Sequence, residues 1–312
     1  MALNCFQKPE LMKILKFAAI DIGSNAIRLL FTNVIEKNGE SYLKKSSLIR
    51  VPIRLGTDTF IGKKISPEKE NKMVDAMIAF RKLMDVHEVV AYRACATSAM
   101  REASNGENLI QRIKKEADIK IDIISGKEEA DIIFSNKLTS ILDPVKTYLY
   151  VDVGGGSTEI TLFSGGISHF SCSFDVGTIK ILKNCVPLNE FIRIKECLID
   201  IRSCSDNIEL IGSGGNINKL FKYASPRNER ELNYHELKEI HSLFNSLSYD
   251  DLMIKHDMNP DRADVIIPAA TIFLSIMEWA NANIIHIPKI GVSDGIIHQL
   301  YQEYSSPKVM VD

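Results

Sequence analysis

Three turns of small residues are the first features of this sequence that could do chemistry. Each follows a short apolar segment, and they are Gly23-Ser24-Asn25, Gly154-Gly155-Gly156-Ser157-Thr158 and Gly212-Ser213-Gly214-Gly215. Glycine permits positive φ angles and lets a phosphate group approach consecutive backbone N–H groups closely. None of the turns is a Walker A loop, and none has the spaced glycines of a dinucleotide-binding fold. A single such turn often only reverses the chain, but three of them, two preceded by aspartate, predict a phosphate-binding site.

Two aspartates stand next to these turns. Asp21 and Asp152 end apolar segments that read as buried strands. A buried carboxylate is costly unless it is paired or binds a cation. Mg²⁺ is held by one or two carboxylates, with water and phosphate oxygens completing its coordination. The pair therefore predicts a metal site, one ligand coming from each half of the chain. The alternative is that each aspartate only caps its own turn through backbone N–H groups.

Three glutamates are candidates for activating water. Glu159 lies three residues beyond Gly156, so that it could face the same cleft, and Glu128 and Glu129 lie in the first turn of a predicted helix. Carboxylates at that position interact favourably with the helix dipole, and this interaction alone would explain Glu128 and Glu129. Their place near a suspected domain boundary keeps a catalytic interpretation open, because a positioned carboxylate assists attack of water on a phosphoanhydride.

The candidate cations for phosphate are Arg28, Arg93, Arg101 and Lys180. Arg101 follows Thr97 by four residues, a spacing that places a hydroxyl and a guanidinium on one side of a turn. Arginine binds phosphate through two parallel hydrogen bonds, which lysine cannot do. Each of these cations could equally be an ordinary surface charge. The histidines show no metal-ligand pairing, and His256-Asp257 lacks the partner histidines of an HD-type phosphohydrolase.

The segments that must position these residues alternate between strand-like and helix-like patterns. In the first half we expect strands at 17–22, 26–34, 41–50, 89–95 and 121–124, and helices at 66–84, 98–102, 109–117 and 127–138. In the second half we expect strands at 148–153, 160–163, 208–211 and 284–287, and helices at 188–201, 217–222, 233–247, 263–280 and 292–304. This alternation is typical of an α/β fold with a partly parallel sheet.

The sequence also repeats itself. The opening pattern of apolar strand, aspartate, aliphatic residue and glycine returns at Tyr148–Gly156, about 130 residues later, which is about one domain's length. We therefore place an N-terminal domain at 1–126 and a second domain of related topology at 127–312. The C-terminal helix is expected to be able to pack back on the first domain.

Composition narrows the function classes. The 312 residues are 45% hydrophobic and 25% charged, which is typical of a globular protein, and the net charge of −2 lacks the basic excess of a nucleic-acid binder. Six cysteines without a metal-ligand spacing are expected to be free thiols in a reducing compartment. The N-terminus lacks the apolar core of a signal peptide, and no apolar run approaches the roughly 20 residues that span a bilayer. We therefore expect a cytoplasmic protein without membrane attachment.

Several segments resemble, in order, the motifs of the exopolyphosphatase / guanosine pentaphosphate phosphohydrolase (Ppx/GppA) family. They are Ala19–Asn25 with Arg28, Ala96–Ala103, Ile124–Ala130, Asp152–Glu159, Gly177–Lys180, Gly212–Gly215 and Asp261–Ile266. The segment Asp152–Glu159 is the most specific of them. Because the matches span nearly the whole chain, chance is a poor explanation.

The resemblance implies an α/β fold of two actin-like, ribonuclease H-like domains, as in acetate kinase, actin and Hsp70, with the active site in the cleft between them. It implies a Mg²⁺- or Mn²⁺-dependent hydrolase that removes terminal phosphate from inorganic polyphosphate or the 5′-phosphate of pppGpp. It makes Glu129 the catalytic base and Glu159 a second catalytic carboxylate, with Asp21, Asp152 and Glu159 as metal ligands. The implied phosphate-binding residues are Gly23, Ser24, Asn25, Arg28, Thr97, Arg101, Gly154, Gly155, Gly156, Ser157, Thr158, Gly214 and Gly215.

Other interpretations stay open. Long members of the family add a C-terminal HD-type domain, whereas this chain ends at Asp312 and resembles the short, two-domain branch, for which short polyphosphate chains are expected. The same fold hosts phosphotransferases. A third interpretation is a non-catalytic sensor of (p)ppGpp or polyphosphate, although a binder of polyanions gains nothing from unneutralised carboxylates. A homodimer through the apolar stretch 266–276 is a further expectation.

Overall fold

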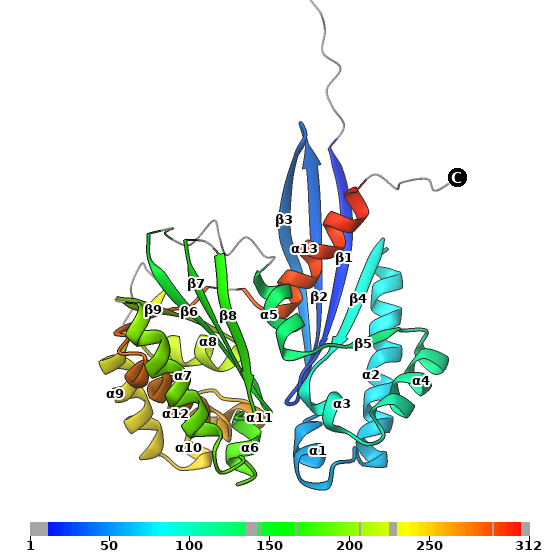
Figure 1. Ribbon diagram of the computed structural model, residues 1–312. Coiled ribbons are helices and arrows are strands. Elements are labelled where there is room, and N and C mark those ends of the chain that lie inside the picture. Colours follow the sequence, from blue (N-terminus) through cyan, green and yellow to red (C-terminus); the bar gives the residue numbers. More distant parts are fainter. Residues whose placement is uncertain are drawn as a thin grey trace, which may run out of the picture.

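The computed structural model describes residues 12–134, 143, 145–165, 167–205, 207–224, 230–288 and 290–306. Figure 1 shows two α/β halves side by side, each built around its own mixed sheet. The fold is the expected α/β class. The last residues of the helix predicted at 127–138, from 135 on, lie outside the described residues, as does Cys5.

The first sheet contains five strands in the order β3-β2-β1-β4-β5. Their bounds are β1 Lys13–Ile22, β2 Ile27–Lys37, β3 Glu40–Val51, β4 Ala91–Ala96 and β5 Ile121–Ile123. β1 to β3 form an antiparallel meander, and β4 and β5 continue the sheet in parallel. The strand β1 is central, and its inner residues form a continuous buried apolar run, as expected for a strand covered on both faces.

The second sheet contains six strands in the order β10-β11-β9-β6-β7-β8. Their bounds are β6 Thr147–Val153, β7 Thr158–Ser164, β8 Ile167–Phe174, β9 Ile208–Ser213, β10 Glu231–Asn233 and β11 Ile284–His286. β6 to β8 repeat the antiparallel meander of the first sheet, and β9 and β11 extend it in parallel. The second half therefore has a strand arrangement related to that of the first, as the repeated sequence pattern predicted. The edge strand β8 was not predicted: serine and histidine residues separate its apolar residues, and only its last residue, Phe174, is buried.

Helices cover both sheets. Their bounds are α1 Gly56–Gly62, α2 Pro67–Val86, α3 Ser98–Glu102, α4 Gly106–Ala117, α5 Gly126–Phe134, α6 Thr178–Leu182, α7 Glu190–Cys204, α8 Gly215–Phe221, α9 Tyr234–Asn245, α10 Tyr249–Ile254, α11 Pro260–Ala263, α12 Ile266–Trp279 and α13 Val292–Ser305. The apolar helix α12 packs against α6, α7, α8 and α9 within the second half. Its apolar residues are thus used inside the chain and leave little surface for the expected dimer contact.

The C-terminal helix α13 crosses to the first half. It packs against β1, β2 and β4 and against α5, and Figure 1 shows it lying across the first sheet. A shared apolar cluster joins the halves there, containing Phe17 of β1, Tyr150 of β6 and Ile296 of α13. Each half also has a core of its own. The domain boundary at 126/127 stays a prediction.

Two expectations from composition can be compared with the structure. The five cysteines in the described part of the chain are all free thiols. Among the described residues, no helix combines the length and apolar character needed to cross a bilayer.

Candidate active site between the two sheets

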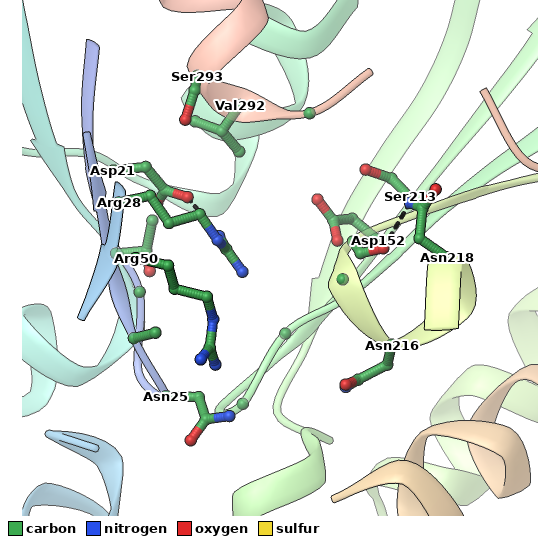
Figure 2. Close-up of a pocket in the computed structure, with 18 of the residues that line it drawn as sticks. Asp21, Asn25, Arg28, Arg50, Asp152, Ser213, Asn216, Asn218, Val292 and Ser293 are labelled. Atoms are coloured by element: carbon green, nitrogen blue, oxygen red, sulfur yellow. Dashed lines mark hydrogen bonds and ion pairs between the residues drawn. The ribbon is translucent and has the colours of Figure 1, made fainter. Parts of the chain in front are cut away.

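A cavity of about 530 Å³ lies between the two halves, where the three glycine-rich turns meet. Figure 2 shows Asp21, Arg28 and Arg50 on one side of it and Asp152 and Ser213 on the other. Because the turns follow β1, β6 and β9, the carboxyl-terminal ends of these strands contribute to the cavity from both sheets. The predicted site residues that line it are Asp21, Gly23, Ser24, Asn25, Arg28, Thr97, Glu129, Asp152, Gly154, Gly155, Ser157, Glu159, Gly214 and Gly215.

Three acids form one end of this cavity: Glu159 is buried, and Glu129 and Asp152 are partly buried. Burial raises the pKa of Glu129 well above its usual value, and the charges of Glu159 and Asp152 raise it further. Burial, followed by the charge of Glu159, raises the pKa of Asp152 to about 7. Burial likewise raises the pKa of Glu159, although its Oε1 accepts hydrogen bonds from the hydroxyls of Ser157 (2.7 Å) and Ser173 (2.9 Å). Crowded acids of this kind favour a nearby cation or the uptake of a proton.

Arginines form the opposite, basic end. The Nη1 of Arg28 donates to Oδ2 of Asp21 at 2.5 Å, and Arg50 forms an ion pair with Asp261. Arg262 also lines the cavity and donates to Oδ1 of Asn216. Burial, and then the neighbouring charges of Arg50 and Arg28, lower the pKa of Arg262 to about 10. Three guanidinium groups close enough to repel one another are typical of a site for a polyanion.

Sequence reasoning missed Arg50 and Arg262 as site residues. Arg262 lies within the matched segment Asp261–Ile266, and its guanidinium lies against Gly215. A Cβ at Gly215 would come within 2.6 Å of Nη2 of Arg262, so that only glycine leaves room for this contact. Arg50 is brought in by strand register, since it pairs with Arg28 between β3 and β2. No spacing along the chain signals either contact.

Three predicted phosphate-binding residues do not line the cavity. The Nη1 of Arg101 donates to the carbonyl oxygen of Ile124 at 2.7 Å, and the hydroxyl of Thr158 donates to the carbonyl oxygen of Val176 at 2.6 Å. Gly156 instead lets the two halves approach, because a Cβ there would come within 2.3 Å of the Phe60 ring. Arg101 still acts electrostatically, since its charge lowers the pKa of Glu129 against the effect of burial. Arg101, Gly156 and Thr158 therefore stabilise the surroundings of the cavity without lining it.

Two other candidate cations are engaged elsewhere. Arg93 forms an ion pair with Glu128 at 3.0 Å. Glu128 is half exposed and does not line the cavity, so that the two adjacent glutamates differ in surroundings. Lys180 is buried, with Nζ 2.8 Å from Oε1 of Glu102. Lys180 thereby links α6 of the second half to α3 of the first, and it serves the contact between halves and not the cavity.

The donor set can be tested against the expected metal. Within the described part of the chain, no group of three or more His, Cys, Asp or Glu side chains is arranged to hold a metal ion by itself. Asp21 is already neutralised by Arg28, whereas Asp152 and Glu159 face each other across β6 and β7, and among the described residues no arginine forms an ion pair with either. Two carboxylates suit Mg²⁺ or Mn²⁺ if water and substrate phosphate complete the coordination. The residues fit such an ion.

Comparison with known proteins points to one family. Residues 34–303 match the family described as the Ppx/GppA phosphatase family. The bifunctional 3-dehydroquinate synthase/phosphatase of Fusobacterium nucleatum is 28% identical over 291 residues, which cover 84% of this chain and 43% of that relative, less than half of its length. Exopolyphosphatase 1 of Mycobacterium tuberculosis is 20% identical over 303 residues, covering 91% of this chain and 87% of that protein.

Solved structures agree on the fold. An exopolyphosphatase from Cytophaga hutchinsonii has a TM-score of 0.79 and 21% identity, covering 92% of this chain and 98% of that one. A Ppx/GppA family member from Aquifex aeolicus has a TM-score of 0.73 and 22% identity, covering 94% of this chain and 100% of that one. At these identities the likeness shows the fold alone, and it confirms the predicted actin-like architecture.

Proposed function

The chain belongs to the Ppx/GppA phosphatase family, and from this premise we propose that it hydrolyses phosphoanhydride bonds. The proposed substrates are inorganic polyphosphate, with short chains favoured, and the 5′-phosphate of pppGpp. One observation carries the proposal: a single cavity is lined by the acids Glu129, Asp152 and Glu159 and by the guanidinium groups of Arg28, Arg50 and Arg262. Such a cavity can hold a chain of phosphates and direct water at its end.

In the proposed reaction, the oxygen of water bonds to the terminal phosphorus while the bridging P–O bond breaks. Glu129 accepts the proton of that water, and its raised pKa brings it toward the range that suits a base near neutral pH. Arg28 stabilises negative charge that develops on the phosphate oxygens. Gly155 lines the same cavity, and its backbone N–H group can donate to the phosphate group.

The carboxylates of Asp152 and Glu159 would hold Mg²⁺ or Mn²⁺. A bound ion would neutralise phosphate charge and favour the ionised form of both acids. The hydroxyls of Ser157 and Ser173 fix the orientation of Glu159 for this role. Asp21, by contrast, is proposed to hold Arg28 in place, since its carboxylate is committed to that guanidinium.

One observation favours the nucleotide as a second candidate substrate. Leu48, Ile290 and Val292 line part of the cavity, and Leu48 is 58% exposed. Inorganic polyphosphate offers no apolar surface to such side chains, whereas a nucleoside does. The apolar lining therefore supports pppGpp.

The test is phosphate release, with Mg²⁺ or Mn²⁺, from short polyphosphate, long polyphosphate and pppGpp measured in parallel. Glu129→Gln removes the proposed base and is expected to lower kcat about 10²- to 10⁴-fold. Glu128→Gln is the matched control, because that neighbouring acid lies outside the cavity and pairs with Arg93. Release by the wild-type protein that survives Glu129→Gln would contradict the role of Glu129. Absence of release from all three substrates would contradict the function.

A further inference from the structure

Arg50 is held across the boundary between the two halves. It lies on β3 directly opposite Arg28 on β2, and Figure 2 shows both side chains pointing into the cavity. Like charges directly opposite each other on neighbouring strands destabilise a sheet unless they are neutralised. Arg28 is neutralised within its own half by Asp21. The carboxylate for Arg50 comes from the other half, from Asp261 on α11.

Asp261 is fixed, whereas Arg50 keeps hydrogen-bonding capacity. Asp261 is buried, and its carbonyl oxygen accepts a hydrogen bond from Nδ2 of Asn25 at 2.7 Å. The Nε of Arg50 is buried and has no hydrogen-bond partner among the described residues. A guanidinium has five N–H donors in a planar fork, so that one carboxylate does not saturate it. Arg50 also lines the cavity, so that its remaining Nη donors can take a second anion beside Asp261.

The charges of the cavity follow an order. Asp21 on β1, Arg28 on β2 and Arg50 on β3 stand side by side in register. Arg50 therefore lies one strand beyond Arg28 along the wall of the cavity that both residues line. A linear chain of phosphates whose end is attacked beside Glu129 and Arg28 would place its next phosphate at Arg50.

We propose that Arg50 binds the phosphate groups beyond the one under attack and gives the site its preference for three or more linked phosphates over two. Asp261 holds the guanidinium in the cavity wall for this contact. This inference rests on the proposed function, since it assigns the substrate length that the same site recognises.

The structure offers a matched control for testing Arg50. Arg54 pairs with Asp264 at 2.5 Å, so that a second Arg–Asp pair joins the same two parts of the chain, yet Arg54 does not line the cavity. The experiment compares kcat/KM for tripolyphosphate and pyrophosphate in the wild type, Arg50→Gln, Arg50→Lys and Arg54→Gln.

Arg50→Gln is expected to lower the ratio of tripolyphosphate to pyrophosphate kcat/KM about tenfold or more, because charge-assisted bonds to an anion are strong. Arg50→Lys should restore part of the ratio, and Arg54→Gln should leave it unchanged. An unchanged ratio in Arg50→Gln, or an equal fall in Arg54→Gln, would overturn the inference. Melting temperatures of all four proteins check that each is folded.

Failure of the proposed function has a separate signature. If the wild type hydrolyses neither compound, calorimetric titration of the same proteins with tripolyphosphate and pyrophosphate tests Arg50 directly. If it does hydrolyse them, the titrations are made in the Glu129→Gln background. The inference expects Arg50→Gln alone to weaken tripolyphosphate binding about tenfold with little change for pyrophosphate. Equal affinities for tripolyphosphate in the wild type and Arg50→Gln would refute it.

Discussion

Asp152 and Glu159 stand opposite each other on β6 and β7, at the place in their hairpin that Asp21 and Arg28 occupy on β1 and β2. In each pair the two residues are seven positions apart in the sequence, and the same kind of strand and turn lies between them. The first hairpin therefore contains a neutralised acid–base pair, whereas the second contains two acids. The two halves thus differ in charge at one register position, and we propose that the second hairpin is the one that binds a cation.

The first prediction concerns pH and stability without metal. The pKa of Asp152 is raised in the folded protein to about 7, above the unfolded value of about 3.9. Its contribution to stability is therefore fully present below about pH 4 and is lost as the pH rises toward 7. In EDTA, the melting temperature of the wild type should fall relative to that of Asp152→Asn between pH 5 and pH 8, by about 2 °C or more. If the melting temperatures of the two proteins changed equally with pH across this range, Asp152 would not be crowded by acids.

The second prediction concerns metal binding. Asp152→Asn and Glu159→Gln should each weaken Mn²⁺ binding at least about tenfold in calorimetric titration, because each removes one of two proposed carboxylate ligands. Asp122→Asn is the control, since Asp122 is a partly exposed acid that pairs with Arg93 outside the cavity. Equal Mn²⁺ affinity in all four proteins would place the ion elsewhere.

The third prediction uses the contact between Gly215 and Arg262. A methyl group at Gly215 would meet the guanidinium nitrogens of Arg262 at 2.6 and 2.8 Å. Because the end of a side chain can shift where backbone cannot, Gly215→Ala should displace the guanidinium and leave the fold intact. Tripolyphosphate affinity is expected to fall about tenfold with a small change in melting temperature. Gly62→Ala, where the added carbon meets no atom of the described residues within 4 Å, should alter neither quantity.

The fourth prediction concerns Asp261. Asp261→Asn removes the carboxylate beside Arg50 and leaves three neighbouring guanidinium groups with less counter-charge. Removing one partner of a buried ion pair lowers the free energy of unfolding by about 3 kcal/mol or more. Inorganic phosphate should restore more stability to Asp261→Asn than to Asp264→Asn, whose arginine partner Arg54 lies outside the cavity. The measurement is urea unfolding at several phosphate concentrations, and equal restoration of the two variants would argue against an anion site at Arg50.

Much of the candidate site could be predicted from local sequence. Strand, aspartate and glycine-rich turn form a continuous pattern, and its return at Tyr148–Gly156 predicted the repeated sheet topology that the structure contains. These features are readable because burial and turn geometry impose residue types on neighbours in the chain. Asp21, Asp152 and Glu159 were found in this way.

Tertiary structure decided which charges share the cavity. Glu128 and Glu129 are adjacent and equally suited to a helix N-terminus, but only Glu129 lines the cavity beside the other acids, whereas Glu128 pairs with Arg93. Arg50 and Arg262 enter from segments far from the turns, whereas Lys180, within a matched motif, is used to join α6 to α3. Local patterns report backbone conformation and burial. Which side chains meet depends on strand register and on the packing of two halves that are distant in sequence, and neither is encoded by the spacing within a motif.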